Sequence, residues 1–195
     1  MNIQSIAQHR RMQGFTMIEL IVVIVILGIL AAVALPRFTN IQRDARIAKL
    51  NAARGAVASA ASIIHGTVLT RGGVADTVAC AAPGFGVNPA NNTVNVCTEN
   101  GRVQIVNGYP TANLLGIVSA AGLGSVFPAT AASLAAEGYA MSGGGAGIAS
   151  TVTIRVTGGG IAATDCAFTY TPSTGSVANS APVVSGITVA SLAGC

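Results

Sequence analysis

Residues 15–35 form a long apolar run in which Glu19 is the only ionisable side chain. As an α-helix the run would be about 31 Å long, which matches the hydrocarbon thickness of a bilayer. Arg10 and Arg11 precede it, and basic residues beside a spanning helix stay on the cytoplasmic side. We therefore expect this segment to cross a membrane.

The presence of Glu19 within residues 15–35 helps to decide between three interpretations of this segment. An ordinary secretory signal could end at the small residues Ala32, Val33 and Ala34, and would release a soluble β protein; a plain anchor would simply stay in place. Neither needs Glu19, whose insertion costs at least about 2.5–3.5 kcal/mol. Cleavage between Gly14 and Phe15 would create an α-amino cation about 6 Å from Glu19 along the helix axis. We expect this processing to supply the partner of the acid.

The motif that carries these residues is Gly14-Phe15-Thr16-Met17-Ile18-Glu19 followed by aliphatic residues. It resembles the cleavage and methylation signature of bacterial type IV prepilins and of the related type II secretion pseudopilins. The resemblance implies that a membrane aspartyl protease, the prepilin peptidase, cuts after Gly14 and methylates Phe15. It also implies that Glu19 neutralises the N-terminal amine of a neighbouring subunit, because a misplaced subunit would leave a buried charge unpaired.

Two further stretches narrow the resemblance. Residues 35–46, LPRFTNIQRDAR, and residues 107–112, NGYPTA, are similar to the corresponding parts of pilins of the mannose-sensitive haemagglutinin (MSHA) type. Those proteins are type IVa pilins of Gram-negative bacteria. The resemblance therefore implies a type IVa subunit.

A proline lies near the end of the apolar run. Pro36 removes a backbone donor and crowds the preceding turn, and Gly28 lies two turns earlier. The sequence predicts either a kink between the two residues or a simple membrane exit at Pro36. We expect one helix over residues 15–66, with a transmembrane part at 15–35 and an amphipathic part at 36–66.

The amphipathic part has two apolar stripes instead of one. Their residues recur at spacings of three and four: Phe38, Ile41, Ala45, Ala48, Ala52, Ala56, Ser59 and Ile63 in the first, and Ile47, Leu50, Val57 and Ile64 in the second. We expect one stripe to pack on the chain's own domain and the other to meet neighbouring subunits. The alternative is a helix buried on both sides within its own domain.

Residues 67–195 are expected to form a globular antiparallel β domain, because alternating apolar runs are separated there by Gly, Pro and Asn. The predicted strands are 93–97, 102–106, 151–157, 166–171 and 183–190, with a tight hairpin turn at Asn100–Gly101. One or two short helices or a structured loop are expected within 112–140. The predicted fold class is α+β, and the resemblance implies the type IV pilin fold.

All four cysteines lie in this distal domain. They lack the close spacing of zinc ligands, so two disulfides are expected. Three connectivities are possible, and we favour Cys80–Cys97 with Cys166–Cys195, which would staple a loop in each half. The second pair resembles the C-terminal disulfide loop of type IV pilins.

Composition argues against catalysis and nucleic-acid binding. Charged residues make up only 8% of the chain, and residues 72–195 carry two arginines against four acids. His9 lies in the expected leader, residues 1–14, and a lone His65 is typical of a surface or capping residue. The glycine-rich loops lack phosphate-binding spacing, so no cofactor or metal is expected.

The expected function is that of a major pilin, a structural subunit that polymerises through its apolar helix into an extracellular filament for adhesion, surface attachment or motility. Its partners would be other copies of itself in a helical filament, the prepilin peptidase and the pilus assembly machinery. Before assembly it would reside in the bacterial inner membrane. The alternative is a type II secretion pseudopilin or a minor pilin that acts in protein export or DNA uptake; no surface receptor is indicated.

Overall fold

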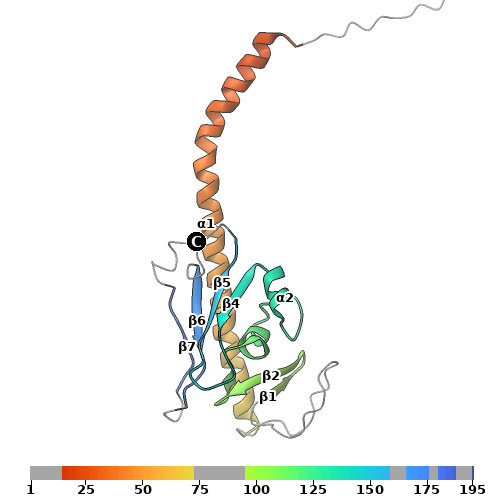
Figure 1. Ribbon diagram of the computed structural model, residues 1–195, viewed down its shortest axis with the longest axis vertical. Helices are drawn as coiled ribbons and strands as arrows, with labels where there is room; N and C mark the ends of the chain where they lie inside the picture. Colours follow the sequence, from red (N-terminus) through yellow and green to blue (C-terminus); the bar gives the residue numbers. More distant parts are fainter. Residues whose placement is uncertain (1–14, 73–94, 159–165, 176–179, 188–194) are drawn as a thin grey trace, which may run out of the picture. The chain divides into compact units, whose positions relative to one another are not determined.

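The computed structural model describes residues 15–72, 95–158, 166–175, 180–187 and 195 (Figure 1). The chain divides into two compact units, Met1–Gln42 and Arg43–Cys195. The helix α1, Met17–Thr70, contributes its first part to one unit and its second part to the other.

The helix α1 begins directly after Thr16 and ends at Thr70, four residues beyond the predicted end at Gly66. Glycine lowers helix stability by about 1 kcal/mol without forcing an end. The chain leaves the helix at Gly72, whose φ of +70° suits a residue without a Cβ. The helix is continuous through Gly28 and Pro36, and a kink under packing stays a prediction.

In the second unit, one face of α1 forms part of the core. Its buried residues include Leu50, Val57 and Ile64 of the predicted second stripe. They pack in two clusters: Leu50 and Val57 lie with Ile117, Ile154, Phe168 and Tyr170, and Ile64 lies with Val68, Val96, Val103 and Ile105. The burial of this stripe therefore fixes the helix to the β domain.

The first sheet is antiparallel, in the order β1-β2-β3: β1 is Asn95–Thr98, β2 is Gly101–Val106 and β3 is Tyr109–Pro110. The predicted first hairpin is present, with Thr98 opposite Gly101, so that Glu99 and Asn100 make the turn and Gly101 begins β2. The short strand β3 was missed. Its signal was Asn107–Gly108, where positive φ values of 49° and 79° fit a type I′ turn.

The second sheet is also antiparallel, in the order β4-β5-β6-β7: β4 is Tyr139–Gly143, β5 Val152–Val156, β6 Ala167–Thr171 and β7 Val183–Val184. The strand β5 alternates buried and half-buried residues, as its sequence pattern predicts. The edge strand β4 was missed because its Tyr-Ala-Met-Ser-Gly sequence has no alternating branched residues. The predicted strand 183–190 is wrong at residues 185–187, which follow the end of β7, and residues 188–190 lie outside the described residues.

Two short helices lie between the sheets in sequence, as the composition of 112–140 suggests. They are η2, Leu114–Val118, which is kinked at Gly116 where the backbone angles are not helical, and α2, Ala131–Ala136, which Thr130 caps. The sheets are joined by a hydrogen bond of 2.7 Å from the hydroxyl of Tyr170 to the carbonyl of Pro110. Burial raises the pKa of Tyr170 well above its ordinary value, so the hydroxyl keeps the proton that it donates.

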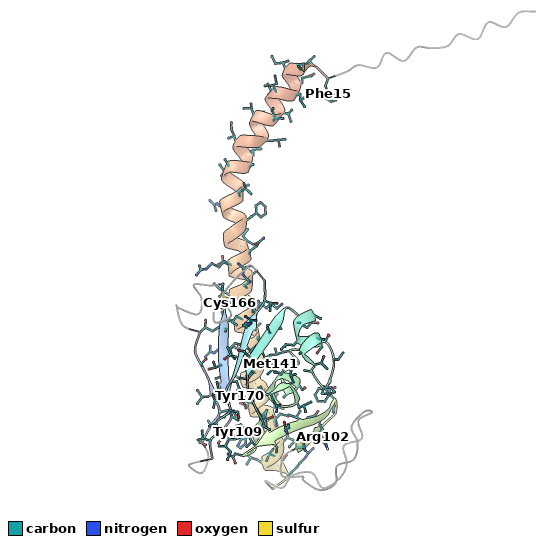
Figure 2. The ribbon with its side chains drawn as sticks, in the orientation of Figure 1. Phe15, Arg102, Tyr109, Met141, Cys166 and Tyr170 are labelled. Atoms are coloured by element: carbon teal, nitrogen blue, oxygen red, sulfur yellow. A yellow bond between two sulfur atoms is a disulfide. The ribbon has the colours of Figure 1, made fainter. Side chains whose placement is uncertain are left out.

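Hydrogen bonds and a disulfide connect α1 to other parts of the second unit. Lys49 donates to the carbonyl of Glu137 at the end of α2, and its ammonium lies 4.6 Å from the centre of the Tyr139 ring. Cys166, labelled in Figure 2, forms a disulfide with Cys195. Arg46 of α1 donates to the carbonyl of Cys195. The architecture is therefore α+β, as predicted: a long helix packed on antiparallel sheets.

Cys97 is also disulfide-bonded. Its predicted partner Cys80 lies outside the described residues, so that pairing stays a prediction.

Candidate functional site

The first turn of α1 holds the acid that the sequence singles out. The backbone N–H of Thr16 donates to Oε2 of Glu19 over 2.8 Å, and its hydroxyl donates to the same oxygen over 2.7 Å. The N–H of Glu19 donates back to the Thr16 hydroxyl over 3.3 Å. This reciprocal arrangement is a capping box, in which a Thr and a Glu three residues later satisfy the free N–H groups of a helix start.

The capping box was missed by the interpretation of the sequence, although Thr16-x-x-Glu19 is its signature. Because of the capping box, the Glu19 carboxylate already accepts hydrogen bonds before the leader is removed. One carboxylate oxygen, Oε2, already has two donors from Thr16, whereas Oε1 has none among the residues that the structure describes. The carboxylate is therefore held in one place with one oxygen open to a further cation.

The segment that follows Glu19 is apolar on every side. Met17–Leu35 is the single stretch within the described parts of the chain that is long and apolar enough to cross a membrane, with a mean hydropathy of 3.1. The large apolar side chains from Phe15 to Ile41 are at least 50% exposed, and Figure 2 shows side chains projecting from both sides of this part of the helix. A continuous apolar surface of this size requires lipid or other protein around it.

The second unit exposes a different kind of helix face. We call it the small-residue face, and it consists of Ala48, Ala52, Gly55, Ser59, Ser62 and Gly66, all exposed. Their spacing of three and four places them along one side of α1, opposite the buried Leu50, Val57 and Ile64. A Cβ added at Gly55 or Gly66 would meet nothing within 4 Å, so the fold of the single chain does not need glycine there.

This face agrees only in part with the first predicted stripe. Ala48, Ala52 and Ser59 of that stripe are exposed, whereas Ala56 is half-buried against the core. Exposed helix faces normally carry Lys and Glu, but the small-residue face has neither. Small residues at such spacing allow another helix to approach closely.

The other residues considered from the sequence have structural roles or lie outside the described parts. His65 is half-buried and stacks on Tyr109, with ring centres 4.0 Å apart and planes 6° apart. Its Nδ1 lies 3.1 Å from the carbonyl of Gly108, so that this nitrogen must carry the proton. Across the described residues, no group of three His, Cys, Asp or Glu side chains lies close enough to hold a metal ion. Gly14 and His9 lie outside these residues.

Comparison with known proteins identifies the N-terminal segment. Residues 9–35 match the family described as the prokaryotic N-terminal methylation motif. The type IV narrow pilus major component PilA5 of Thermus thermophilus is 51% identical over 53 residues.

This similarity is confined to part of both proteins. It covers 27% of the chain and 46% of the relative, so the chain spans about half the length of the curated relative that it matches. No solved structure matches the chain. The methylation motif and the similarity to a pilus component therefore show that the N-terminal part of the chain is similar to that of a type IV pilin.

Proposed function

We propose that the chain is a major pilin, the structural subunit of a type IV pilus. The observation that carries this proposal is the exposed apolar helix Met17–Leu35, with Glu19 held in its first turn, within a stretch that matches a methylation motif. A soluble protein cannot keep such a surface in water. A subunit that waits in a membrane and then enters a filament core has an apolar environment in both states.

Processing is the first step of the proposed function. The prepilin peptidase cuts between Gly14 and Phe15 and methylates the new N-terminus, which keeps its positive charge. Lone-pair sites on Oε1 of Glu19 then accept the amine of an adjacent subunit while Thr16 holds Oε2. The geometry supports this step because an acid with one oxygen already satisfied and oriented loses less entropy when it binds a cation.

Assembly through the helix is the second step. The apolar part of α1 leaves the inner membrane and packs with copies of itself, and the small-residue face allows the helices of neighbouring subunits to approach. The result is a helical filament outside the cell. The similarity of residues 35–46 and 107–112 to MSHA-type pilins supports a type IVa subunit that serves adhesion, surface attachment or motility.

A mass spectrum of the subunit in sheared surface filaments tests this function. We expect filaments made mainly of this chain, without residues 1–14, with a methylated Phe15 and with the mass of a fully disulfide-bonded polypeptide. Gly14→Glu, the matched control, should accumulate as uncut precursor in the membrane. Filaments built from subunits that retain the leader, or a mature chain that starts after Ala34, would contradict the proposal. A trace component in filaments made of another subunit would indicate the minor-pilin alternative.

Gly55 tests the small-residue face. Gly55→Ala should raise the stability of the helix by about 1 kcal/mol, and Gly55→Leu should leave the fold of the chain intact, because nothing lies within 4 Å of an added Cβ. In the filament, a leucine side chain on this face should keep neighbouring helices apart and reduce filament yield about tenfold or more.

The two readouts are unfolding of the purified chain by circular dichroism and the amount of sheared filament. A variant Gly55→Leu that folds and assembles like the unaltered chain would show that this face meets solvent in the filament.

A further inference from the structure

Two Asn-Gly pairs lie at opposite ends of β2, at the two hairpins of the first sheet. Asn100 is the second residue of the turn between β1 and β2 and Gly101 begins β2, whereas Asn107 and Gly108 are the turn between β2 and β3. Asn-Gly is the sequence at which a peptide bond most readily attacks a neighbouring side chain, because glycine has no Cβ to hinder its own nitrogen. The same dipeptide is therefore present twice in one small sheet, in two different environments.

The Asn107–Gly108 turn is held from three directions. The side-chain amide of Asn107 donates to the carbonyl of Ser173 over 3.0 Å, and His65 donates to the carbonyl of Gly108 over 3.1 Å. Tyr109 is fixed in turn by its stacking on His65. To bring its side-chain carbon to the nitrogen of Gly108, Asn107 would have to break the bond to Ser173 and rotate the turn against His65.

The side chain of Asn100 has fewer constraints than that of Asn107. Asn100 is exposed, its φ is not positive, and its side-chain amide has no hydrogen-bond partner among the described residues. The Thr98 hydroxyl donates to the carbonyl of Gly101 over 2.7 Å and does not involve the Asn100 side chain. Gly101 is buried at the start of β2, so the constraint at this hairpin falls on the glycine and not on the asparagine side chain.

We propose that Asn100–Gly101 is a site of spontaneous deamidation in the folded protein, and that the fold protects Asn107–Gly108 from the same reaction. The backbone nitrogen of Gly101 attacks Cγ of Asn100 and loses its proton, and the side-chain nitrogen leaves as ammonia. Water then opens the resulting succinimide at either carbonyl, which gives aspartate or isoaspartate at position 100. The reaction involves no oxidation or reduction, and water is the only co-reactant.

The product changes the turn in two ways. It places a second negative charge beside Glu99, in a domain that carries few charges. Isoaspartate also adds one carbon to the main chain between two strands whose register depends on the pairing of Thr98 with Gly101. A filament that is not replaced would therefore accumulate altered hairpins with time, whatever its biological role.

Peptide mapping of the purified full-length protein, aged at mildly alkaline pH, tests the proposal. Trypsin cleaves at Arg102, between the two sites, so each asparagine is read in its own peptide. In the folded protein we expect conversion at Asn100 to be several-fold faster than at Asn107. In the reduced and denatured protein both should react at comparable rates, which shows that the fold causes the difference.

The variant His65→Ala is the matched control. It removes the donor to the Gly108 carbonyl and should speed conversion at Asn107 without a change at Asn100. Equal rates at the two sites in the folded protein would overturn the proposal. So would an unreacted Asn100 in folded protein after the denatured protein has been converted.

Discussion

Replacing Glu19 by alanine is expected to abolish filaments while the chain is still inserted, cleaved and methylated. Removal of one partner from a buried charge pair leaves the N-terminal amine unpaired in an apolar core, which costs about 3–5 kcal/mol. That cost corresponds to a loss of more than about a hundredfold in the equilibrium for adding a subunit. The measurements are the mass of the membrane-bound subunit and the yield of sheared filaments.

The variant Thr16→Val separates the two roles of Glu19. It removes the hydroxyl bonds of the capping box and should cost about 1 kcal/mol at the start of the helix, yet it leaves the carboxylate available to a neighbouring amine. We expect filaments to form with Thr16→Val. If Thr16→Val lost filaments as completely as Glu19→Ala, the carboxylate would be needed only to cap its own helix. The proposed pairing of Glu19 with the N-terminal amine of another subunit would then be contradicted.

Gly116→Ala is expected to cause the largest loss of stability in the second unit. A Cβ at this position would lie 2.2 Å from both the carbonyl oxygen and the hydroxyl of Thr111. Thr111 is fully buried, and its carbonyl accepts from the N–H groups of Asn113 and Ile117. The overlap must separate η2 from this residue, so we expect a loss of about 3 kcal/mol in the free energy of unfolding.

Urea unfolding of the purified protein measures this effect. Gly186→Ala serves as the control, because its added Cβ would meet nothing within 4 Å. We expect the control to change stability by less than about 0.5 kcal/mol. A Gly116→Ala protein as stable as the control would show that η2 can move away from Thr111 without cost.

The parts of the structure that follow from local rules could be predicted from the sequence. The period of the apolar residues predicted the helix and two apolar stripes, of which the structure buries the one with Leu50, Val57 and Ile64. Alternation predicted β2 and β5 for the same reason. Together, the helical period and the strand alternation predicted the α+β class.

What was missed depends on contacts between distant residues or on position in a sheet. The strand β4 is an edge strand whose small residues are held by pairing with β5, and its sequence alone shows no preference for a strand. The packing of Gly116 on Thr111 could not be predicted because nothing in the local sequence places the two together.

Only part of the candidate site was predicted from the sequence. The unusual position of Glu19 was visible at once, because an acid in an apolar helix needs an explanation. Its local partner was overlooked, although Thr16 carries the signal for a capping box. The small-residue face was visible as a stripe, but only the structure shows that Gly55 and Gly66 face open space.

One face of the second part of α1 forms part of the hydrophobic core over most of its length, and this has a mechanical consequence. A tensile load applied along the helix reaches the sheets as shear spread over every buried contact from Leu50 to Val68 at once. Simultaneous rupture of many contacts resists force better than peeling them apart one by one. Lys49 and Arg46 add hydrogen bonds to the same junction, so in the proposed filament a pull along the helix should not readily separate α1 from the sheets.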